Sequence, residues 1–325
     1  MGEWHPAPAL QADKRVSIKA MEPFEVHILG CGSALPTTRH NATSQIVRIG
    51  NKQFMIDCGE GTQLQMRRSH IHFSFVNHIF ISHLHGDHCF GLIGLISTFA
   101  LLGRKAPLHI YADPLLQRLM QPQLDFFCKG LGYALYFHPI DATLHTTIYE
   151  DNSITIETLP LEHRLPCCGF LFKEKPKKRH LIGSMIEYYN IPIHLRAALK
   201  EGAHYTTPDG TLVPNGRLTT APDPSRSYAY CSDTLPCPSI IEHIHRADLL
   251  YHEATFAQSE HARARETYHS TAREAAQIAL DAEVKQLIIG HFSSRYKDDS
   301  LLLEEAREIF PATHLADEGL IFDIK

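Results

Sequence analysis

The chain has 325 residues, 44% of them hydrophobic, and its formal net charge is −5 with histidine counted as neutral. This length fits one large domain with insertions or two domains, and the apolar content is enough to fill a sizeable core. The net charge argues against a protein coated with positive charge, although it is compatible with a local basic patch. No uninterrupted apolar run is long enough to span a bilayer, and the N-terminus lacks a signal-peptide pattern.

The eight cysteines show no spacing typical of a disulfide framework, so we expect the protein to be cytoplasmic. The adjacent pair Cys167-Cys168 is compatible with metal or redox chemistry, but small buried side chains beside a site are the preferred interpretation. The 23 histidines fit a protein that binds metal.

Residues 1–20 do not resemble part of a domain. They include a proline-rich segment around Trp4 and a short charged run, and we interpret Met21 as the natural start. We therefore expect residues 1–20 to form a poorly ordered leader and residues 21–325 to form the domain.

The domain is expected to open with β-structure. Residues 26–29 alternate in polarity and run into a glycine turn, which predicts a strand. Segments 44–49 and 53–56 flank Gly50-Asn51, which predicts a hairpin. The glycines of the segment 57–62 then let the chain turn sharply.

A run of three histidines and one aspartate follows a predicted buried strand over 78–81. In layered α/β structures, ligands and chemistry belong at the carboxyl end of a strand. His83 and His85 point the same way in an extended backbone, whereas the adjacent Asp87 and His88 diverge. One divalent metal can take the first pair and a second metal the other pair. A solvated polar turn is the alternative, but four ligand-type residues in this order argue against it.

The next part of the chain alternates strands with one helix, which Asp113-Pro114 caps at its start. The strand over 154–159 leads to His163. The strands of this region are expected at 108–111, 135–137, 146–149, 154–159 and 168–172.

Residues 173–224 are predicted to form an insertion that projects from the core, because they combine short amphipathic pieces with several turn signals. The insertion begins with the most basic stretch of the chain and contains three tyrosines. Basic and aromatic residues in one projecting element favour contact with a phosphate backbone. A solvated basic arm without a partner is the alternative. The candidate phosphate contacts are Lys175, Lys177, Lys178 and Arg179.

The second half repeats the design of the first. Strands over 228–234 and 286–290 end at Asp233 and His291, and a helix begins near Ser270 or Thr271. Ligand-type residues thus stand at strand ends in both halves. The pattern predicts an α/β fold, an αββα sandwich with the site along one edge of two sheets.

The run from His83 to His88 resembles the signature of the metallo-β-lactamase superfamily, and within it the chain resembles the ribonuclease Z family of tRNA 3′-processing endoribonucleases. The resemblance extends from Glu25 to the C-terminus. It rests on the following further motifs: Pro36 with Arg39 and Asn41, Asp57 to Gln63, Ser82 to Leu92, His163 with Pro166 and Gly169, Ser232 to Thr234, His252 to Phe256, His269 to Thr271, and His291 to Tyr296.

The resemblance implies two Zn²⁺ ions per subunit, with Mn²⁺ as an alternative. One ion would be held by His83, His85 and His163, the other by Asp87, His88 and His291, and Asp233 would bridge them. Asp87 would also orient or deprotonate the nucleophile, and His269, tuned by Glu253, would protonate the leaving oxygen. Further substrate contacts are expected at Arg39, Asn41, Ser293 and Arg295.

The family resemblance also implies precursor tRNA as the substrate, a homodimer and no membrane. The chain departs from the family in two places. The Gly-Pro element of the arm is absent where the chain reads Asn190-Ile191-Pro192, which weakens the prediction of a grip on tRNA, and Gly290 replaces a common threonine.

Three other functions are considered for a chain with these motifs. A small-molecule phosphodiesterase of the same superfamily would share the seven ligands without needing the arm. A non-catalytic RNA-binding relative would typically have lost ligands, and none looks lost here. A β-lactamase or thioesterase would explain neither the arm nor the motif at His269.

Overall fold

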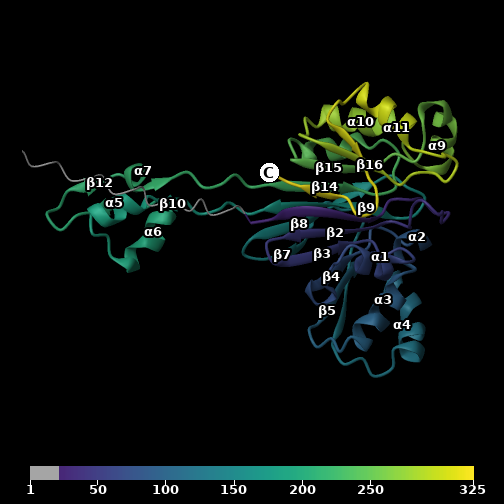
Figure 1. The fold of residues 1–325 in the computed structure, drawn as a ribbon, viewed down its shortest axis with the longest axis horizontal. Helices are drawn as coiled ribbons and strands as arrows, with labels where there is room; N and C mark the ends of the chain where they lie inside the picture. The colour runs from purple at the N-terminus through teal and green to yellow at the C-terminus, as the bar shows by residue number, and fades with distance from the viewer. Residues whose placement is uncertain (1–21) are drawn as a thin grey trace, which may run out of the picture.

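The computed structural model describes residues 22–325, so the leader predicted over 1–20 lies outside the described residues. Two seven-stranded sheets pack face to face, and helices cover their outer faces (Figure 1). This arrangement confirms the predicted αββα sandwich. Over the described range, we find no helix with the length and apolar character needed to cross a membrane.

The first sheet has the strand order β18-β1-β2-β3-β4-β5-β6. The predicted hairpin is confirmed, because β2 and β3 are antiparallel and Ile49 lies opposite Lys52. From β3 to β6 neighbouring strands are parallel. The strands are β1 (Phe24–Gly30), β2 (Ser44–Ile49), β3 (Lys52–Ile56), β4 (Val76–Phe80), β5 (Leu108–Ala112), β6 (Leu135–Pro139) and β18 (Ile321–Asp323). The helices of this half are α1 (Thr62–Arg68), α2 (Gly86–Cys89), α3 (Leu92–Leu101), α4 (Leu115–Phe127) and the 3₁₀ turn η1 (Phe73–Phe75).

The second sheet has the strand order β17-β16-β15-β14-β9-β8-β7. Strands β14 to β17 are parallel, and β7, β8 and β9 are antiparallel. The strands are β7 (Thr147–Glu150), β8 (Ile154–Leu161), β9 (Cys167–Glu174), β14 (Ser227–Cys231), β15 (Leu249–Glu253), β16 (Leu287–Gly290) and β17 (Thr313–Leu315). The helices are α8 (Ile241–Ile244), α9 (His261–Thr267), α10 (Ala272–Asp281), α11 (Ser300–Arg307) and the 3₁₀ turns η3 (Pro238–Ile240) and η4 (Gln258–Glu260).

Aromatic rings join the two sheets in the core. Phe80 of the first sheet packs on Phe170 of the second with ring centroids 5.6 Å apart, and Phe54 packs on Phe172 at 5.9 Å. All four side chains are buried. Full burial of one such side chain contributes about 1.5–3 kcal/mol, so these contacts stabilise the packing of the two sheets.

The parallel strands explain why distant residues meet at one edge. The carboxyl ends of neighbouring parallel strands lie at the same edge of a sheet. The chain leaves β4 just before His83, leaves β14 just before Asp233 and leaves β16 at His291. The turn from β8 to β9 adds His163 at the same edge.

Helix α10 begins with the cap that the sequence predicted. Thr271 is the N-cap residue: its hydroxyl accepts from the Glu274 backbone N–H, and the Glu274 carboxylate accepts from the Thr271 N–H at 2.9 Å. Such a cap is worth about 1 kcal/mol. It fixes the chain two residues after His269.

The insertion stands away from the body on two chain segments (Figure 1). It lies between the end of β9 at Glu174 and the start of β14 at Ser227, and it has a small apolar cluster of its own. Its elements are β10 (His180–Leu181), α5 (Gly183–Tyr188), η2 (Ile193–Leu195), α6 (Arg196–Lys200), β11 (Tyr205–Thr206), β12 (Leu212–Val213), α7 (Asn215–Leu218) and β13 (Thr219–Thr220). The cluster residues are Ile186, Ile191, Leu199, Tyr205, Val213 and Leu218.

A buried ion pair anchors the insertion to the body. The Arg226 guanidinium donates to both oxygens of Glu174, at 2.7 and 3.0 Å, and also to the backbone carbonyls of Ile324 and Glu22. Both charged side chains are almost fully buried. Without Arg226, Glu174 would keep only Lys177, which contacts one of its oxygens at 2.8 Å. Removal of one partner of a buried pair typically costs about 3–5 kcal/mol.

The Arg226→Met variant should therefore lower the free energy of unfolding by about 3–5 kcal/mol. The matched control is Arg246→Met, because Arg246 pairs with Glu283 at the exposed surface and such pairs are worth about 0–1 kcal/mol. Urea denaturation followed by circular dichroism measures both. Equal, small losses in the two variants would contradict this role of Arg226.

Candidate metal centre

The buried carboxylate of Asp57 organises the turn that carries the histidine run. It accepts from the Ser82 backbone N–H at 2.8 Å, from the Ser82 hydroxyl at 2.9 Å and from His88 Nδ1 at 2.8 Å. The Tyr230 hydroxyl of the second sheet donates to it at 2.8 Å. Asp57 has a positive φ of 55°, a conformation that costs energy for a non-glycine residue. These hydrogen bonds compensate that cost and fix the turn.

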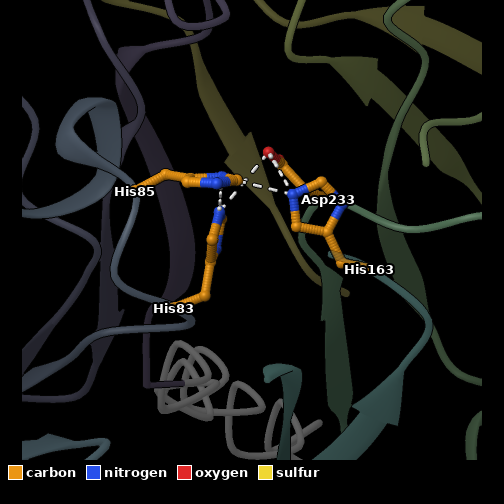
Figure 2. A group of neighbouring side chains, drawn as sticks. All are labelled: His83, His85, His163 and Asp233. Atoms are coloured by element: carbon orange, nitrogen blue, oxygen red, sulfur yellow. Dashed lines mark hydrogen bonds and ion pairs between the residues drawn. The ribbon is translucent and has the colours of Figure 1, made fainter. Parts of the chain in front are cut away.

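Four ligand-type side chains converge in a first group, which Figure 2 draws: His83, His85, His163 and Asp233. His85 Nδ1 lies 2.9 Å from His83 Nε2 and 3.2 Å from His163 Nε2. Asp233 Oδ2 lies 3.5 Å from His83 Nε2. Ligand atoms around a tetrahedral Zn²⁺ stand roughly 3.3 Å apart when each metal–ligand bond is about 2.0–2.1 Å. The spacing of the group therefore suits one metal ion.

A second group shares Asp233 with the first and adds Asp87, His88 and His291. Asp233 Oδ1 lies 3.4 Å from His88 Nε2 and 3.2 Å from His291 Nε2. Asp87 Oδ2 lies 3.4 Å from both of these nitrogens. One oxygen of Asp233 thus faces each group. The structure brings together all seven residues that the sequence predicted as ligands.

Hydrogen bonds on the outer side of the rings orient them toward the centre. The Nδ1 of His163 donates to the Tyr268 carbonyl at 2.8 Å, and the Nδ1 of His88 bonds to Asp57. The Nδ1 of His291 lies 2.9 Å from the Thr255 hydroxyl. Such bonds fix the tautomer and leave Nε2 free to bind metal.

Two buried polar atoms inside the centre have no hydrogen-bond partner among the described residues. They are His88 Nε2 and Asp233 Oδ1. An unsatisfied buried polar group costs about 1–3 kcal/mol. Both atoms belong to the second group, and a divalent cation there would satisfy both. The residues present therefore fit metal ions.

The electrostatics of His83 and Asp233 agree with this fit. Burial lowers the pKa of His83 to about 4, and neighbouring His88 adds to the effect, so the ring is neutral at pH 7. Burial alone would raise the pKa of Asp233, but His291 and His88 hold it well below its usual range. Neutral imidazole and ionised carboxylate are the forms that bind metal. Burial alone would lower the pKa of His88, but Asp233, Asp57 and Asp87 raise it well above its usual range, so His88 must give up a proton to bind a metal ion.

His269 and Glu253 form a pair beside the two groups. The His269 Nδ1 donates to Glu253 Oε1 at 2.8 Å, and the fully buried carboxylate also accepts from the backbone N–H groups of Thr234, Ser270 and Thr255. The Thr255 hydroxyl donates to Glu253 Oε2 at 2.7 Å, so it links this pair to His291. Burial alone would lower the pKa of His269, but the Glu253 carboxylate raises it to about 9. His269 can therefore hold a proton at neutral pH.

An open pocket of about 600 Å³ leads to the centre. Ser293 and Arg295 line it, as the sequence predicted, and so do two arginines that sequence reasoning missed, Arg164 and Arg263. Arg295 is paired with Glu260 at 2.5 Å. Arg164 and Arg263 have no carboxylate partner among residues 22–325, so their charge is available to a phosphate. A larger cavity, of about 800 Å³, lies between the ends of α1 and α3 and contains none of the predicted site residues.

Two predicted substrate contacts take part in internal contacts beside the pocket. The Arg39 guanidinium donates to both oxygens of Asp299, at 2.9 and 3.1 Å, and the backbone N–H of Asn41 donates to Glu318 at 2.6 Å. Neither residue lines the pocket. Their contacts support the loop that does.

The basic stretch lies at the base of the insertion, and its charge is largely paired. Each of three lysines meets a glutamate, and Arg179 donates to the Thr219 hydroxyl at 2.8 Å. The sequence could not predict these pairs, because two of the glutamates are more than twenty positions away. The lysine pairs are Lys175 with Glu150 at 2.5 Å, Lys177 with Glu174 at 2.8 Å and Lys178 with Glu201 at 2.8 Å.

Curated relatives match nearly the whole chain. Ribonuclease Z of Bacteroides thetaiotaomicron is 59% identical over 304 residues, which cover 94% of this chain and 96% of that protein. Ribonuclease Z of Phocaeicola vulgatus is 60% identical over 305 residues, which cover 94% and 99%. A family model described as Anti-Pycsar protein Apyc1 matches residues 24–182.

Solved structures share the fold. Human tRNase Z, short form, superposes with a TM-score of 0.67 at 24% identity and covers 93% of this chain and 99% of that one. The metallo-β-lactamase fold protein YhfI from Bacillus subtilis superposes with a TM-score of 0.66 at 18% identity and covers 93% and 100%. At these identities the likeness concerns the fold alone.

Glu253→Gln removes the carboxylate that raises the pKa of His269. In the metal-free protein we expect this pKa to fall from about 9, because burial then acts with only the Asp233 carboxylate to oppose it. NMR titration of the imidazole resonances measures the midpoint. Glu260→Gln is the control, since Glu260 pairs with Arg295 instead. An unchanged midpoint in Glu253→Gln would contradict the assignment.

Proposed function

The chain belongs to the ribonuclease Z family, and we propose that it is a zinc-dependent endoribonuclease that removes the 3′ trailer from precursor tRNA. The observation that carries the proposal is the convergence of seven His and Asp side chains into two groups that share Asp233. A nuclease with two metals needs such a constellation. The choice of substrate rests on relatives named Ribonuclease Z, which are 59% and 60% identical and cover 94% of this chain.

The ligand assignment follows from the two groups. We propose that His83, His85 and His163 hold one Zn²⁺, that Asp87, His88 and His291 hold the other, and that Asp233 bridges them; Mn²⁺ is the alternative metal. Two bound ions would supply a hydroxide nucleophile near neutral pH and would neutralise charge on the phosphate.

Two residues at the centre are proposed to carry out the two proton transfers of the reaction. Asp87 orients the attacking water or accepts its proton. As the nucleophile's oxygen bonds to phosphorus, the bond from phosphorus to the 3′ oxygen of the tRNA breaks. His269, kept protonated by Glu253, donates its proton to that 3′ oxygen. The products are a tRNA with a 3′-hydroxyl and a trailer with a 5′-phosphate.

Substrate binding is assigned to the pocket and to the insertion. Arg164 and Arg263 lie at the pocket and have no carboxylate partner in the described part of the chain, and Arg295 and Ser293 lie beside them. The insertion is proposed to grip tRNA away from the cut, although its basic stretch is largely paired with glutamates. We further propose a homodimer in which the arm of one subunit serves the site of the other.

A small-molecule phosphodiesterase remains the alternative function. The fold is shared with proteins described as yeast PDE1 and as a diphosphatase of the PhnP family, at 12% and 17% identity. The open pocket would also admit a small phosphodiester. The insertion distinguishes the two functions, because a small substrate would bind in the pocket without contacting the insertion.

The direct assay is cleavage of a 3′-extended precursor tRNA by the purified, zinc-loaded protein. We expect one cut at the 3′ end of the acceptor stem, and we expect Asp87→Ala to lose it, because a ligand and proton acceptor is removed. Gel electrophoresis of end-labelled RNA measures the products. Hydrolysis of bis-p-nitrophenyl phosphate with precursor tRNA left intact would favour the phosphodiesterase instead.

His269→Ala tests the proton donor. A 3′ oxygen leaves poorly without a proton, so kcat on precursor tRNA should fall about 10²–10⁴-fold. The p-nitrophenolate leaving group of bis-p-nitrophenyl phosphate needs no proton, so kcat on this ester should fall far less. Equal losses on the two substrates would refute the assignment of His269 as the acid.

Deletion of the insertion tests the proposed grip. Replacement of residues 180–220 by a short Gly/Ser linker removes an element with its own apolar cluster and leaves the cores of the two sheets intact. We expect the ratio of kcat/KM for precursor tRNA to kcat/KM for bis-p-nitrophenyl phosphate to fall at least about 10-fold, since 1.4 kcal/mol of lost contact gives this factor. An unchanged ratio would mean that the insertion does not bind the substrate.

A further inference from the structure

A second set of ligand-type side chains lies behind the wall of the pocket. Cys31 follows β1, His40 belongs to the loop before β2, and Glu318 belongs to the loop between β17 and β18. Cys31 Sγ lies 3.2 Å from His40 Nδ1 and 3.8 Å from Glu318 Oε2, and the latter two atoms are 3.0 Å apart. No residue of this trio belongs to the two groups described above.

The spacing of the three atoms suits one tetrahedral ion. Bonds of about 2.3 Å to sulfur and 2.0–2.2 Å to nitrogen or oxygen place the ligand atoms roughly 3.3–3.6 Å from one another. The three measured distances bracket these values. Asp317 Oδ1, 4.0 Å from His40 Nδ1, is close enough to supply a fourth ligand.

The outer side of His40 has the support that a metal-bound histidine usually has. His40 Nε2 donates to Asp299 Oδ2 at 2.9 Å, and the same carboxylate accepts two hydrogen bonds from Arg39. A carboxylate on the far nitrogen fixes the tautomer that presents Nδ1 to a metal and strengthens it as a ligand. This contact is independent of the spacing of the trio.

The charge around the trio is negative. The carboxylates of Asp299, Asp317 and Glu318 surround His40 and a fully buried thiol. Burial first, and then these three carboxylates, raise the pKa of the Cys31 thiol well above its usual range. Arg39 compensates Asp299. Burial alone would lower the pKa of His40, but its hydrogen bonds to Asp299 and Glu318 raise it to about 9, so without a metal the His40 imidazolium is the second compensating cation. A metal ion would take the place of the proton on His40 Nδ1 and would permit a thiolate at Cys31.

We propose that Cys31, His40 and Glu318 bind a structural Zn²⁺, with Asp317 as the fourth ligand. The ion would join the start of the sheet to the chain near its C-terminal end. It would also brace the pocket, because Ser33, Ala34 and Pro36 of the adjoining loop line it. The Phe292 N–H, next to His291, donates to the Cys31 carbonyl at 3.0 Å, so the brace reaches the main centre.

The test measures the number of metal ions per chain and whether a cysteine thiolate binds one of them. The whole protein is stripped of metal, reloaded with Co²⁺, desalted and measured by elemental analysis and absorption spectroscopy. We expect three ions per chain and a thiolate-to-cobalt charge-transfer band in the near ultraviolet. The main centre contains only histidine and aspartate ligands, so the band reports the trio alone.

Cys31→Ala should lose the band and one ion, whereas Cys231→Ala, which removes a buried thiol of β14 outside the trio, should keep both. If Cys31→Ala fails to fold, Glu318→Gln provides a second test, because this variant should also lose one ion. Two ions and no band in the unaltered protein would overturn the proposal and would leave a protonated His40 as the compensating cation. A band that survives Cys31→Ala would also overturn it. Neither reading uses the enzyme's activity, so the result is separate from that of the proposed nuclease function.

Discussion

The geometry of the candidate centre depends on one buried carboxylate, that of Asp57. It receives hydrogen bonds from Ser82 and His88 of the first sheet and from Tyr230 of the second. A buried carboxyl group is tolerated only when its oxygens are hydrogen-bonded, so the packing of the two sheets must bring these donors to Asp57. These hydrogen bonds therefore fix the position of the histidine run relative to the strand that leads to Asp233. The aromatic contacts between the sheets supply stability, whereas Asp57 supplies position.

The candidate centre contains several features that are unfavourable for folding. His88 Nε2 and Asp233 Oδ1 are buried without partners among the described residues, and His291 adopts a left-handed backbone conformation with φ 62°. Such features persist when surrounding structure over-determines them, and they are typical of functional sites. The chain of hydrogen bonds from His291 through Thr255 to Glu253 and His269 joins the metal-binding and proton-donating parts. A change in one part is therefore expected to affect the other.

Much of this arrangement was predictable from the sequence, and the reasons are physical. His83, His85, Asp87 and His88 occupy neighbouring positions, and Asp233 and His291 end apolar strands whose carboxyl ends meet at one edge in a parallel sheet.

Other features depended on contacts between segments far apart in the chain. The sequence offered no sign that Asp57 would bond His88, that Arg164 and Arg263 would share a pocket, or that Lys175 would be paired with Glu150. Local patterns predict which residues lie on which face of an element, but they do not predict which partner a charge finds across the fold.

In the proposed centre, Asp233 stands between two metal ions. Anomalous diffraction from crystals of the zinc-loaded protein, recorded on either side of the zinc absorption edge, tests it most directly. Besides any peak at Cys31, His40 and Glu318, we expect two peaks about 3.5–4 Å apart, one beside each oxygen of Asp233, with His83, His85 and His163 around the first and Asp87, His88 and His291 around the second. A single peak beside Asp233, or no peak there, would contradict the two-metal centre.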